Sequence, residues 1–370
     1  MKSISDFRDA GLARHLVEKI NSTSTRKINL MEVCGTHTVA ISRNGIRQVI
    51  PKTIKLLSGP GCPVCVTANA DIDRAIELAK LDGVIMTTFG DMMKVPGSYS
   101  SFAKEKAAGA DIRVVYSTVD ALKIAEENPD REVIFFGVGF ETTAPTVALS
   151  VIEARKRHLK NYSVFAKHKV VPPAMAALLS LGEVKIDGFI CPGHVSAVIG
   201  SAPYEFIAED YGIPCVIVGF EPIDILQGIL MLVEQIESGR SEVDIQYTRT
   251  VRPEGNPTAL KLLDEVFKIS DADWRGIGVI HATGLELRPE FAEFDAEKRF
   301  SVEPPPTKEP KGCACGEVLR GVKLPFDCKM FGRSCTPEHP VGPCMVSTEG
   351  SCAAYYRYER ANIEVGTSAG

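Results

Sequence analysis

Short apolar runs rich in Val and Ile recur along the chain, and most of them end in a turn that contains Gly or Pro. A helical pattern usually follows the turn. Short runs bounded by such turns are typical of buried strands. The runs that we interpret as strands are residues 28–33, 54–58, 84–88, 112–116, 133–137, 163–166, 188–191, 214–219 and 276–280.

The helical patterns place apolar residues three and four positions apart. In the first of them, residues 6–20, Phe7, Leu12, Leu16 and Ile20 lie near one face. The others are residues 70–81, 146–157, 173–181, 203–211 and 223–238. Strands that alternate with helices predict parallel sheets covered by helices on both faces.

The C-terminal part of the chain has a different character. Residues 312–356 combine many turn-forming residues with six of the eleven cysteines, which are Cys313, Cys315, Cys328, Cys335, Cys344 and Cys352. A segment so rich in Gly and Pro makes a poor core, and its thiols offer a crosslink in the form of disulfides, a zinc site or an iron–sulfur cluster. Structural zinc sites usually use two close cysteine pairs, whereas only Cys313 and Cys315 are close here. Separated thiolates can wrap a [4Fe-4S] cluster, so the spacing favours the cluster.

Nine strands are many for one parallel sheet. We therefore expect an α/β protein with two parallel-sheet α/β domains and a C-terminal cysteine-rich iron–sulfur domain. The predicted divisions are residues 1–27 for an N-terminal helix, 28–131 and 132–240 for the two α/β domains, and 241–370 for the C-terminal domain. Within the last, residues 301–310 are rich in Pro and charge and predict a linker.

Composition and charge exclude several classes of protein. The chain is 45% hydrophobic and 24% charged, which is ordinary for a globular protein. A formal net charge of −5 and the lack of a basic run argue against nucleic-acid binding. No stretch is apolar enough to span a membrane, and the first residues lack the apolar core of a signal peptide. We therefore expect a cytoplasmic protein, in which reduced thiols serve metals or catalysis.

Polar residues that could carry chemistry lie just after the apolar runs, where parallel sheets bind their ligands. Cys34-Gly-Thr-His37 follows the first run. Its cysteine and histidine could form an activated thiol or a soft metal-ligand pair, and His37 could act as a general acid or base. The alternative is a small buried cysteine with a capping histidine.

A C-x-x-C motif follows the second run, in Gly59-Pro-Gly-Cys62-Pro-Val-Cys65, and precedes the helical pattern 70–81. The motif is predicted to lie at or just before a helix N-terminus, where the helix dipole stabilises a thiolate. We interpret Cys62 and Cys65 as a redox dithiol. The alternative is half of a zinc site, although no second C-x-x-C completes it.

Three further polar residues follow later runs. Glu141 is a carboxylate placed for proton transfer or binding, while His194 and Asp91 each end a turn. Each of them could equally be structural. The segment around Glu141 is not a dinucleotide fingerprint, because Thr142 occupies the third glycine position, and no phosphate-binding Gly-x-x-x-x-Gly-Lys loop occurs.

Taken together, these motifs resemble the HypD family of [NiFe]-hydrogenase maturation factors. The matching segments occur in order along nearly the whole chain, and they are Cys34-Gly-Thr-His37, Gly59-Pro-Gly-Cys62-Pro-Val-Cys65, Gly139-Phe-Glu-Thr-Thr-Ala-Pro145, Pro192-Gly-His-Val-Ser196 and Cys344-Met-Val-Ser-Thr-Glu-Gly-Ser-Cys352. One position departs, because Thr38 stands where some members have a second histidine. The resemblance implies a scaffold that, with the small protein HypC, assembles an iron atom carrying two cyanides and one carbon monoxide. It also implies that HypE delivers the cyanide and that the finished unit passes to the hydrogenase large-subunit precursor.

The resemblance also implies a role for individual residues. Cys34 would hold the iron with His37 beside it, and Cys62 and Cys65 would be the C-x-x-C of the family. The ligands of the [4Fe-4S] cluster would be Cys313, Cys328, Cys335 and Cys352. Cys315 and Cys344 would remain as a thiol pair beside the cluster, an arrangement similar to that of ferredoxin–thioredoxin reductase. We infer that this pair exchanges with a Cys62/Cys65 disulfide if a domain interface brings the two pairs together.

Two other functions stay open at this point. An iron–sulfur disulfide reductase acting on protein thiols would use the same cluster and C-x-x-C, but it would give no role to Cys34 or Glu141. A zinc-stabilised interaction protein would have no redox chemistry and would be colourless after anaerobic purification.

Overall fold

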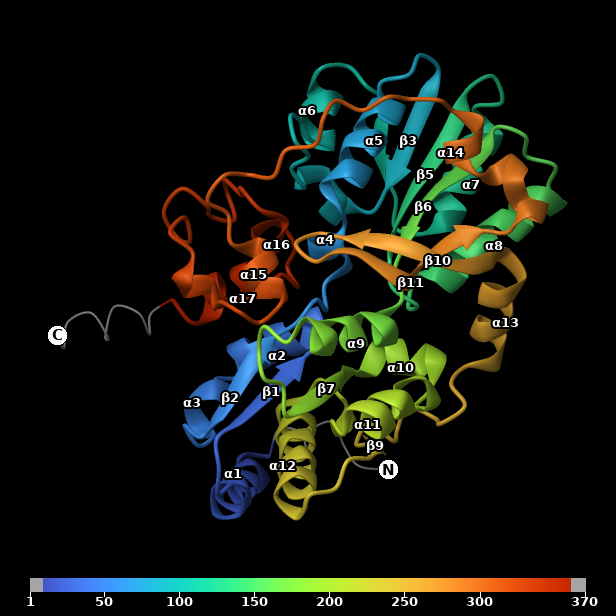
Figure 1. Cartoon of the computed structure of the whole chain (residues 1–370). Helices are drawn as coiled ribbons and strands as arrows, with labels where there is room; N and C mark the ends of the chain where they lie inside the picture. The colour runs from blue at the N-terminus through green and yellow to red at the C-terminus, as the bar shows by residue number, and fades with distance from the viewer. Residues whose placement is uncertain (1–8, 361–370) are drawn as a thin grey trace.

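A computed structural model describes residues 9–360 of the chain (Figure 1). These residues form two parallel β-sheets surrounded by helices, a two-stranded hairpin, and a tail made mostly of loops. The predicted α/β class with two parallel sheets is therefore confirmed, and the cysteine-rich segment forms a separate body beside them.

The first sheet has the order β2-β1-β7-β8-β9, and every neighbouring pair of strands is parallel. Its strands are β1 (Ile28–Glu32), β2 (Ile54–Ser58), β7 (Gly188–Pro192), β8 (Cys215–Val218) and β9 (Val243–Ile245). Helices α1 (Ala10–Thr23) and α12 (Pro222–Ser238) pack together, and Leu16 and Ile20 are buried as predicted. Leu12, one turn before Leu16, is 36% exposed, and Phe7 lies outside the described residues.

The second sheet has the order β4-β3-β5-β6 and is also entirely parallel. Its strands are β3 (Val84–Thr88), β4 (Ile112–Val114), β5 (Glu132–Gly139) and β6 (Tyr162–His168). Buried side chains of α7 (Thr118–Glu127) and α8 (Ala144–Lys156) share one hydrophobic cluster with the sheet, and those of α5 (Asn69–Ala79) share another. Both faces are thus covered, which explains why most side chains of β3, β5 and β6 are buried.

The hairpin corrects one strand prediction. β10 (Phe267–Trp274) and β11 (Gly278–Leu287) pair antiparallel, so the run 276–280 belongs to the turn and the start of β11 and not to a parallel sheet. A short apolar run does not reveal the direction of its partner strand. β10 was not predicted, because four of its eight side chains are polar and only its two end residues are buried.

The two sheets are interleaved in sequence. β1 and β2 share a sheet with strands from residues 188–245, and β3 and β4 share one with strands from residues 132–168. Each sheet therefore draws on both of the predicted segments 28–131 and 132–240, and the boundary between those segments falls inside the second sheet. Similar apolar runs serve either sheet, so the sequence does not reveal where the chain crosses between them.

The chain returns from the hairpin through η4 (Pro289–Phe294), α14 (Ala296–Arg299) and the predicted linker 301–310, which has no regular structure. The linker runs along the second sheet's helices (Figure 1), where Tyr99 donates a hydrogen bond to the Pro306 carbonyl at 2.8 Å. The tail then forms α15 (Cys315–Leu319), α16 (Pro343–Val346) and α17 (Ser351–Tyr358). It packs on α2 (Gly35–Arg43) and α4 (Pro63–Val66), and one buried hydrophobic cluster includes side chains of both sheets, the hairpin and the tail.

Candidate functional site

Cys34 is the N-cap of α2 and follows directly after β1. The nearby backbone N–H groups of Thr36 and His37, which are among the donors that a helix start leaves open, act to lower the pKa of its thiol. Burial, and after it the charge of Glu349, raises the pKa of Cys34 to about 12. The thiol is therefore protonated at neutral pH, and a metal that binds the sulfur displaces this proton.

Glu349 of the tail covers the Cys34 turn. Thr36 Oγ1 donates a hydrogen bond to Glu349 Oε1 at 2.6 Å, across 313 positions of the chain. A Cβ atom on Gly35 would lie 2.5 Å from the Glu349 Cβ and 2.6 Å from its carbonyl oxygen, so only glycine permits this contact. Burial raises the pKa of Asp91 and lowers that of His194, and the charge of Glu349 raises both. Glu349 thus lies near three of the residues that follow the predicted strands, which are Cys34, Asp91 and His194.

Phe220 lies between two imidazole rings. Its ring centroid is 4.8 Å from that of His37 and 4.0 Å from that of His194. His37 Nε2 is 3.1 Å from the Val218 carbonyl and 3.0 Å from the Gly219 carbonyl, so this nitrogen carries the proton. Burial lowers the pKa of His37 to about 4, so the ring is neutral at neutral pH. Its Nδ1 has no hydrogen-bond partner among the described residues.

The C-x-x-C lies beside the Cys34 turn and at the start of a helix, as predicted. Cys62 is the N-cap of α4, and its sulfur accepts a hydrogen bond from the Cys65 backbone N–H at 3.3 Å. The Gly35 N–H donates to the Gly61 carbonyl at 2.8 Å, and a Cβ on Gly61 would lie 2.1 Å from the Cys34 nitrogen. The two turns are therefore held together through their backbones.

Cys344 is the centre of a group of buried thiols. Hydrogen bonds from Cys315, Cys352 and Cys65 to the Cys344 sulfur lower its pKa well below the ordinary thiol value. Burial and its bonds to Cys344 and Cys62 raise the pKa of Cys65 instead. Among these thiols, Cys344 is therefore the one best placed to carry a negative charge.

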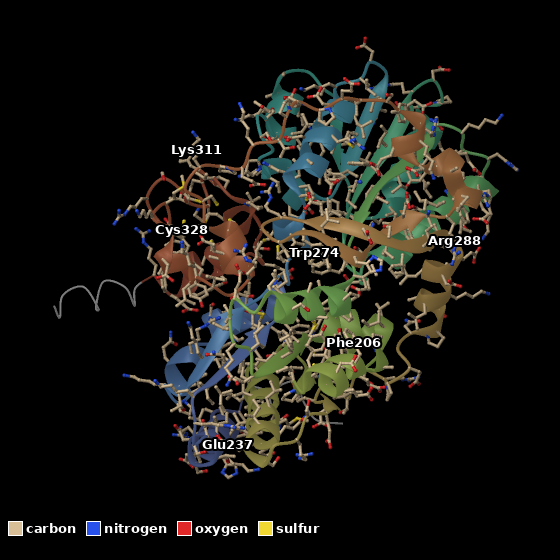
Figure 2. The ribbon with its side chains drawn as sticks, in the orientation of Figure 1. Phe206, Glu237, Trp274, Arg288, Lys311 and Cys328 are labelled. Carbon is tan, nitrogen blue, oxygen red and sulfur yellow. The ribbon has the colours of Figure 1, made fainter. Side chains whose placement is uncertain are left out.

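The four predicted cluster ligands lie around the same group. Cys313 and Cys352 hydrogen-bond to Cys315, and Cys335 lies within its electrostatic reach. Cys328, on the outer side of the tail in Figure 2, donates a hydrogen bond to the Gly312 carbonyl at 3.9 Å. Within residues 9–360, no three His, Cys, Asp or Glu side chains converge as a ready-made metal site. The donor set nevertheless fits an iron–sulfur cluster chemically, because it consists of soft thiols gathered in one loop-rich segment.

Glu141 lies apart from the thiols. Its Oε1 accepts a hydrogen bond from the Val171 N–H at 2.9 Å, and its Oε2 is buried without a partner among the described residues. Burial raises the pKa of Glu141 to about 7. The side chain lines a hollow of about 640 Å³ between the first sheet's helices, α13 (Pro257–Val266) and the hairpin. No described cysteine or histidine lines this hollow, so Glu141 does not share the thiol site.

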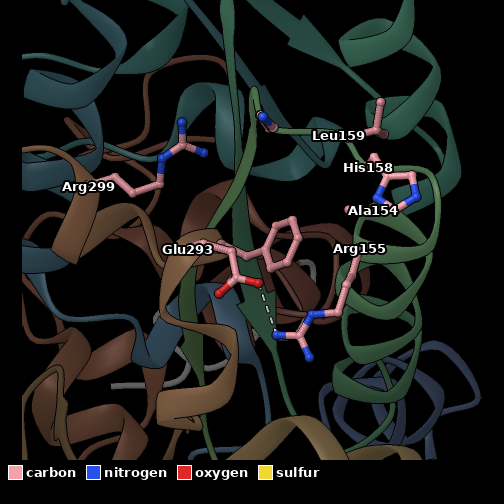
Figure 3. Close-up of a pocket in the computed structure, with 8 residues that line it drawn as sticks. Ala154, Arg155, His158, Leu159, Glu293 and Arg299 are labelled. Atoms are coloured by element: carbon pink, nitrogen blue, oxygen red, sulfur yellow. Dashed lines mark hydrogen bonds and ion pairs between the residues drawn. The ribbon is translucent and has the colours of Figure 1, made fainter.

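Another hollow, of about 560 Å³, lies between α8 and η4 (Figure 3). Arg155 pairs there with Glu293 at 3.0 Å and lies 3.9 Å over the Phe291 ring. These contacts attach η4 to α8. None of the residues predicted for the site lines this hollow, so it forms no part of the thiol site.

Sequence reasoning missed two residues of the site, Phe220 and Glu349. Glu349 lies inside a motif that was quoted for its cysteines, and nothing in the sequence indicates that the tail folds back onto residue 36. Phe220 belongs to Gly219-Phe-Glu221, which repeats Gly139-Phe-Glu141. That repetition was the only signal for it.

No described helix is long and apolar enough to cross a lipid bilayer.

Comparisons with known proteins agree on one family. A model of HypD, described as the hydrogenase formation hypA family, matches residues 11–359. A hydrogenase maturation factor HypD of Rhizobium leguminosarum bv. viciae is 50% identical, over 99% of this chain and 97% of its own length. Hydrogenase maturation factor HypD2 of Bradyrhizobium diazoefficiens is 48% identical, over 97% of both chains. A putative hydrogenase expression/formation protein of Methanocaldococcus jannaschii is 44% identical, over 96% of this chain and 99% of its own length.

Proposed function

The chain belongs to the HypD family of hydrogenase maturation factors, and we propose that it is the scaffold on which, together with HypC, an iron atom receives two cyanides and one carbon monoxide. Cys34 holds the iron, and HypE delivers the cyanide. The finished unit passes to the large-subunit precursor of a [NiFe]-hydrogenase by way of HypC.

One observation carries the proposal. The tail segment that begins at Cys344 contacts Cys65 of the C-x-x-C through its cysteine and the Cys34 turn through Glu349. The iron-holding thiol, the dithiol and the tail thiols therefore meet at one junction, as the scaffold function requires. A reductase acting only on protein thiols would have no need for Cys34 at this junction.

The surroundings of Cys34 suit the iron. The backbone N–H groups of Thr36 and His37 stabilise a thiolate once the thiol proton has left. Thiolates are suitable ligands for the Fe(II) that strong-field cyanide and carbon monoxide select. His37 and His194 stack on Phe220 close by, and the buried His37 stays neutral. A neutral ring carries no positive charge that would attract the anionic cyanide away from the iron.

The thiols supply a two-electron exchange. The Cys344 thiolate attacks the Cys65 sulfur of a Cys62–Cys65 disulfide, which releases the Cys62 thiolate and forms a mixed disulfide. Cys315 then loses its proton to the released Cys62 thiolate and attacks Cys344, which releases Cys65 and leaves a Cys315–Cys344 disulfide. The C-x-x-C gains two electrons, and the tail pair loses them.

The cysteines Cys313, Cys328, Cys335 and Cys352 would hold a [4Fe-4S] cluster beside this pair. Such a cluster supplies single electrons at low potential, which the tail disulfide needs in order to return to two thiols. The exposed side of Cys328 gives external electron donors access to the site.

Infrared spectra test the iron site. The chain is purified anaerobically with HypC, and its nitrile and carbonyl stretches are compared with those of Cys34→Ala and of Cys215→Ala. Cys215 is a buried strand cysteine outside the thiol group, so its variant controls for the loss of a sulfur. We expect both stretches in the native protein and in Cys215→Ala, and neither in Cys34→Ala. Stretches that survive in Cys34→Ala would show that the iron is bound elsewhere.

The thiol exchange has a separate test. Hydrogenase activity is measured in cells that carry Cys315→Ser or Cys344→Ser in place of the native chain. Both variants are expected to lose maturation, because neither can complete the tail disulfide. Full activity in Cys315→Ser would refute the exchange while leaving the iron site intact.

A further inference from the structure

The tip of the hairpin is inserted between the C-x-x-C helix and the tail. Trp274 bridges to Thr67 at the end of α4, and the Arg275 N–H donates to the Val66 carbonyl at 2.9 Å. On the other side, a Cβ on Gly276 would lie 2.2 Å from the Gly316 Cα, so the tip contacts α15 backbone to backbone. Figure 2 shows Trp274 at this junction. The position of residue 275 is therefore fixed by backbone contacts to both neighbours.

The guanidinium of Arg275 is buried with open hydrogen-bond donors. The residue is 4% exposed, and its Nη2 donates to Asn69 Oδ1. Its Nε and Nη1 have no hydrogen-bond partner among the described residues. Glu309 forms a long ion pair with Nε at 3.9 Å, and its side chain is 58% exposed. A buried cation with open donors costs several kcal/mol unless a negative charge balances it.

The thiols of the tail lie next to this cation. The hydrogen bond with Cys315 and burial raise the pKa of Cys313, and the charge of Arg275 opposes them. Cys315 begins α15 directly before Gly316, the residue that contacts the hairpin tip. A buried cation is therefore built into the contact between the hairpin tip and the cysteine-rich tail. Its ion-pair partner Glu309 is more than half exposed, so the charge of Arg275 is balanced only in part until a negatively charged group binds to the tail.

We propose that Arg275 is the built-in countercharge of the thiolate-bound cluster of the tail, and that it raises the cluster's reduction potential. Reduction adds one electron to the [4Fe-4S] core and makes the core with its four thiolates one unit more negative. A fixed positive charge at low dielectric stabilises this reduced form more than the oxidised one.

The inference rests on the proposed function, because it requires a cluster on Cys313, Cys328, Cys335 and Cys352. The hairpin tip then has a second consequence. Arg275 is attached through its backbone to Val66, the last residue of the C-x-x-C helix. Arg275 therefore acts on the potential of the cluster, and its backbone bond to Val66 also fixes its position relative to the dithiol that receives the electrons.

A redox titration of anaerobically purified protein tests the inference. The cluster is reduced stepwise with dithionite, and its midpoint potential is read from the electron paramagnetic resonance signal. Native protein is compared with Arg275→Gln, which removes the charge, with Arg275→Lys, which keeps it, and with Lys311→Gln. Lys311 is two positions from Cys313 but exposed (Figure 2), so its variant makes the same change in net charge where water screens it.

We expect Arg275→Gln to disfavour reduction at least tenfold at a fixed potential, a shift of 59 mV or more to the negative side for a one-electron couple. Arg275→Lys and Lys311→Gln should stay close to the native midpoint. Equal midpoints in native protein and Arg275→Gln would overturn the inference, as would an equal shift in Lys311→Gln.

Loading of the cluster gives a second readout, from iron and acid-labile sulfide. A loss of loading in Arg275→Gln that Arg275→Lys restores supports the countercharge. An equal loss in both variants overturns it, because geometry and not charge would then decide. Native protein without iron and sulfide would refute the cluster itself, and with it the part of the proposed function on which the inference rests.

Discussion

Replacement of Gly35 by alanine should separate the tail from the Cys34 turn. Gly35 is the first residue of α2 and has ordinary helical backbone angles, so alanine fits its local conformation. The added Cβ would, however, lie 2.5 Å from the Glu349 Cβ, 2.6 Å from its carbonyl oxygen and 3.2 Å from its carbonyl carbon. Two of these atoms belong to the tail backbone, so a change of side-chain rotamer cannot relieve the overlap.

The magnitude follows from two opposing effects. Overpacking of this kind costs about 1–3 kcal/mol. Alanine in place of glycine in a helix returns up to about 1 kcal/mol. When the full gain is subtracted, the net cost is about 0–2 kcal/mol, and it acts on the contact between tail and turn and not on the sheets. A local opening that is easier by about 1.4 kcal/mol is populated about tenfold more often.

Hydrogen exchange followed by mass spectrometry measures this opening. Amides of α16 and α17 should exchange about tenfold faster in Gly35→Ala, while those of α8, which covers the second sheet, stay unchanged. Cys34, which is 7% exposed in the native protein, should also react faster with a maleimide. Gly90→Ala is the matched control, because its Cβ would meet only Val114 at an ordinary 3.4 Å. If Gly35→Ala matched both the native protein and this control in exchange and labelling, the close approach of Glu349 would be wrong.

Two further predictions concern the second sheet. Gly137→Ala would place a Cβ 2.7 Å from His168 Cε1, so we expect the free energy of unfolding, measured in urea, to fall by about 1–3 kcal/mol. His168→Ala in the same chain should partly restore it, and additive losses in the double variant would contradict this. Burial raises the pKa of Glu141 to about 7, above the ordinary carboxyl value of 4.5, so the folded state holds a proton that the unfolded state has released. The stabilisation from this bound proton is complete below pH 4.5 and is lost as the pH rises to about 7. The native protein should therefore lose up to about 3 kcal/mol of stability between pH 5 and pH 8 relative to Glu141→Gln. Parallel pH profiles of the two proteins would refute this.

Much of the fold could be predicted because burial on both faces leaves a local signal. β2 and β3 match their predicted runs, residues 54–58 and 84–88, residue for residue. The order of strands could not be predicted, since it depends on where the chain crosses between sheets, and no local pattern records a crossing. The same holds for β10, whose stability comes from pairing with β11 and not from its own sequence.

The residues of the site likewise fall into those that a local sequence pattern reveals and those that only the fold reveals. The thiols were found in sequence because cysteine spacing is informative by itself. Contacts between segments far apart in the chain were not found, and these give the site its electrostatics. Glu349 reaches the Cys34 turn across 313 positions, and Arg275 reaches the tail from a hairpin tip that no motif marks. Each is one charged residue in an otherwise ordinary stretch, so only the folded chain distinguishes it from a surface charge.

The Cys34 turn, the C-x-x-C and the tail around Cys344 are held in place in different ways. The C-x-x-C lies on the connection that leaves the first sheet for the second, and Gly61 in that connection crosses the backbone of Cys34 at a distance that excludes any side chain. Cys34 and Cys62 are therefore fixed to each other by the backbone, whatever the state of their sulfurs. The backbone of Cys344 is held within the tail itself, because a Cβ on Gly350 would lie 2.2 Å from the Cys344 carbonyl oxygen, whereas its sulfur interacts with Cys65, Cys315 and Cys352. Under the proposed function, a change of bonding among these thiols would therefore act first on the tail, while Cys34, held through its backbone, would keep its position as it binds the iron.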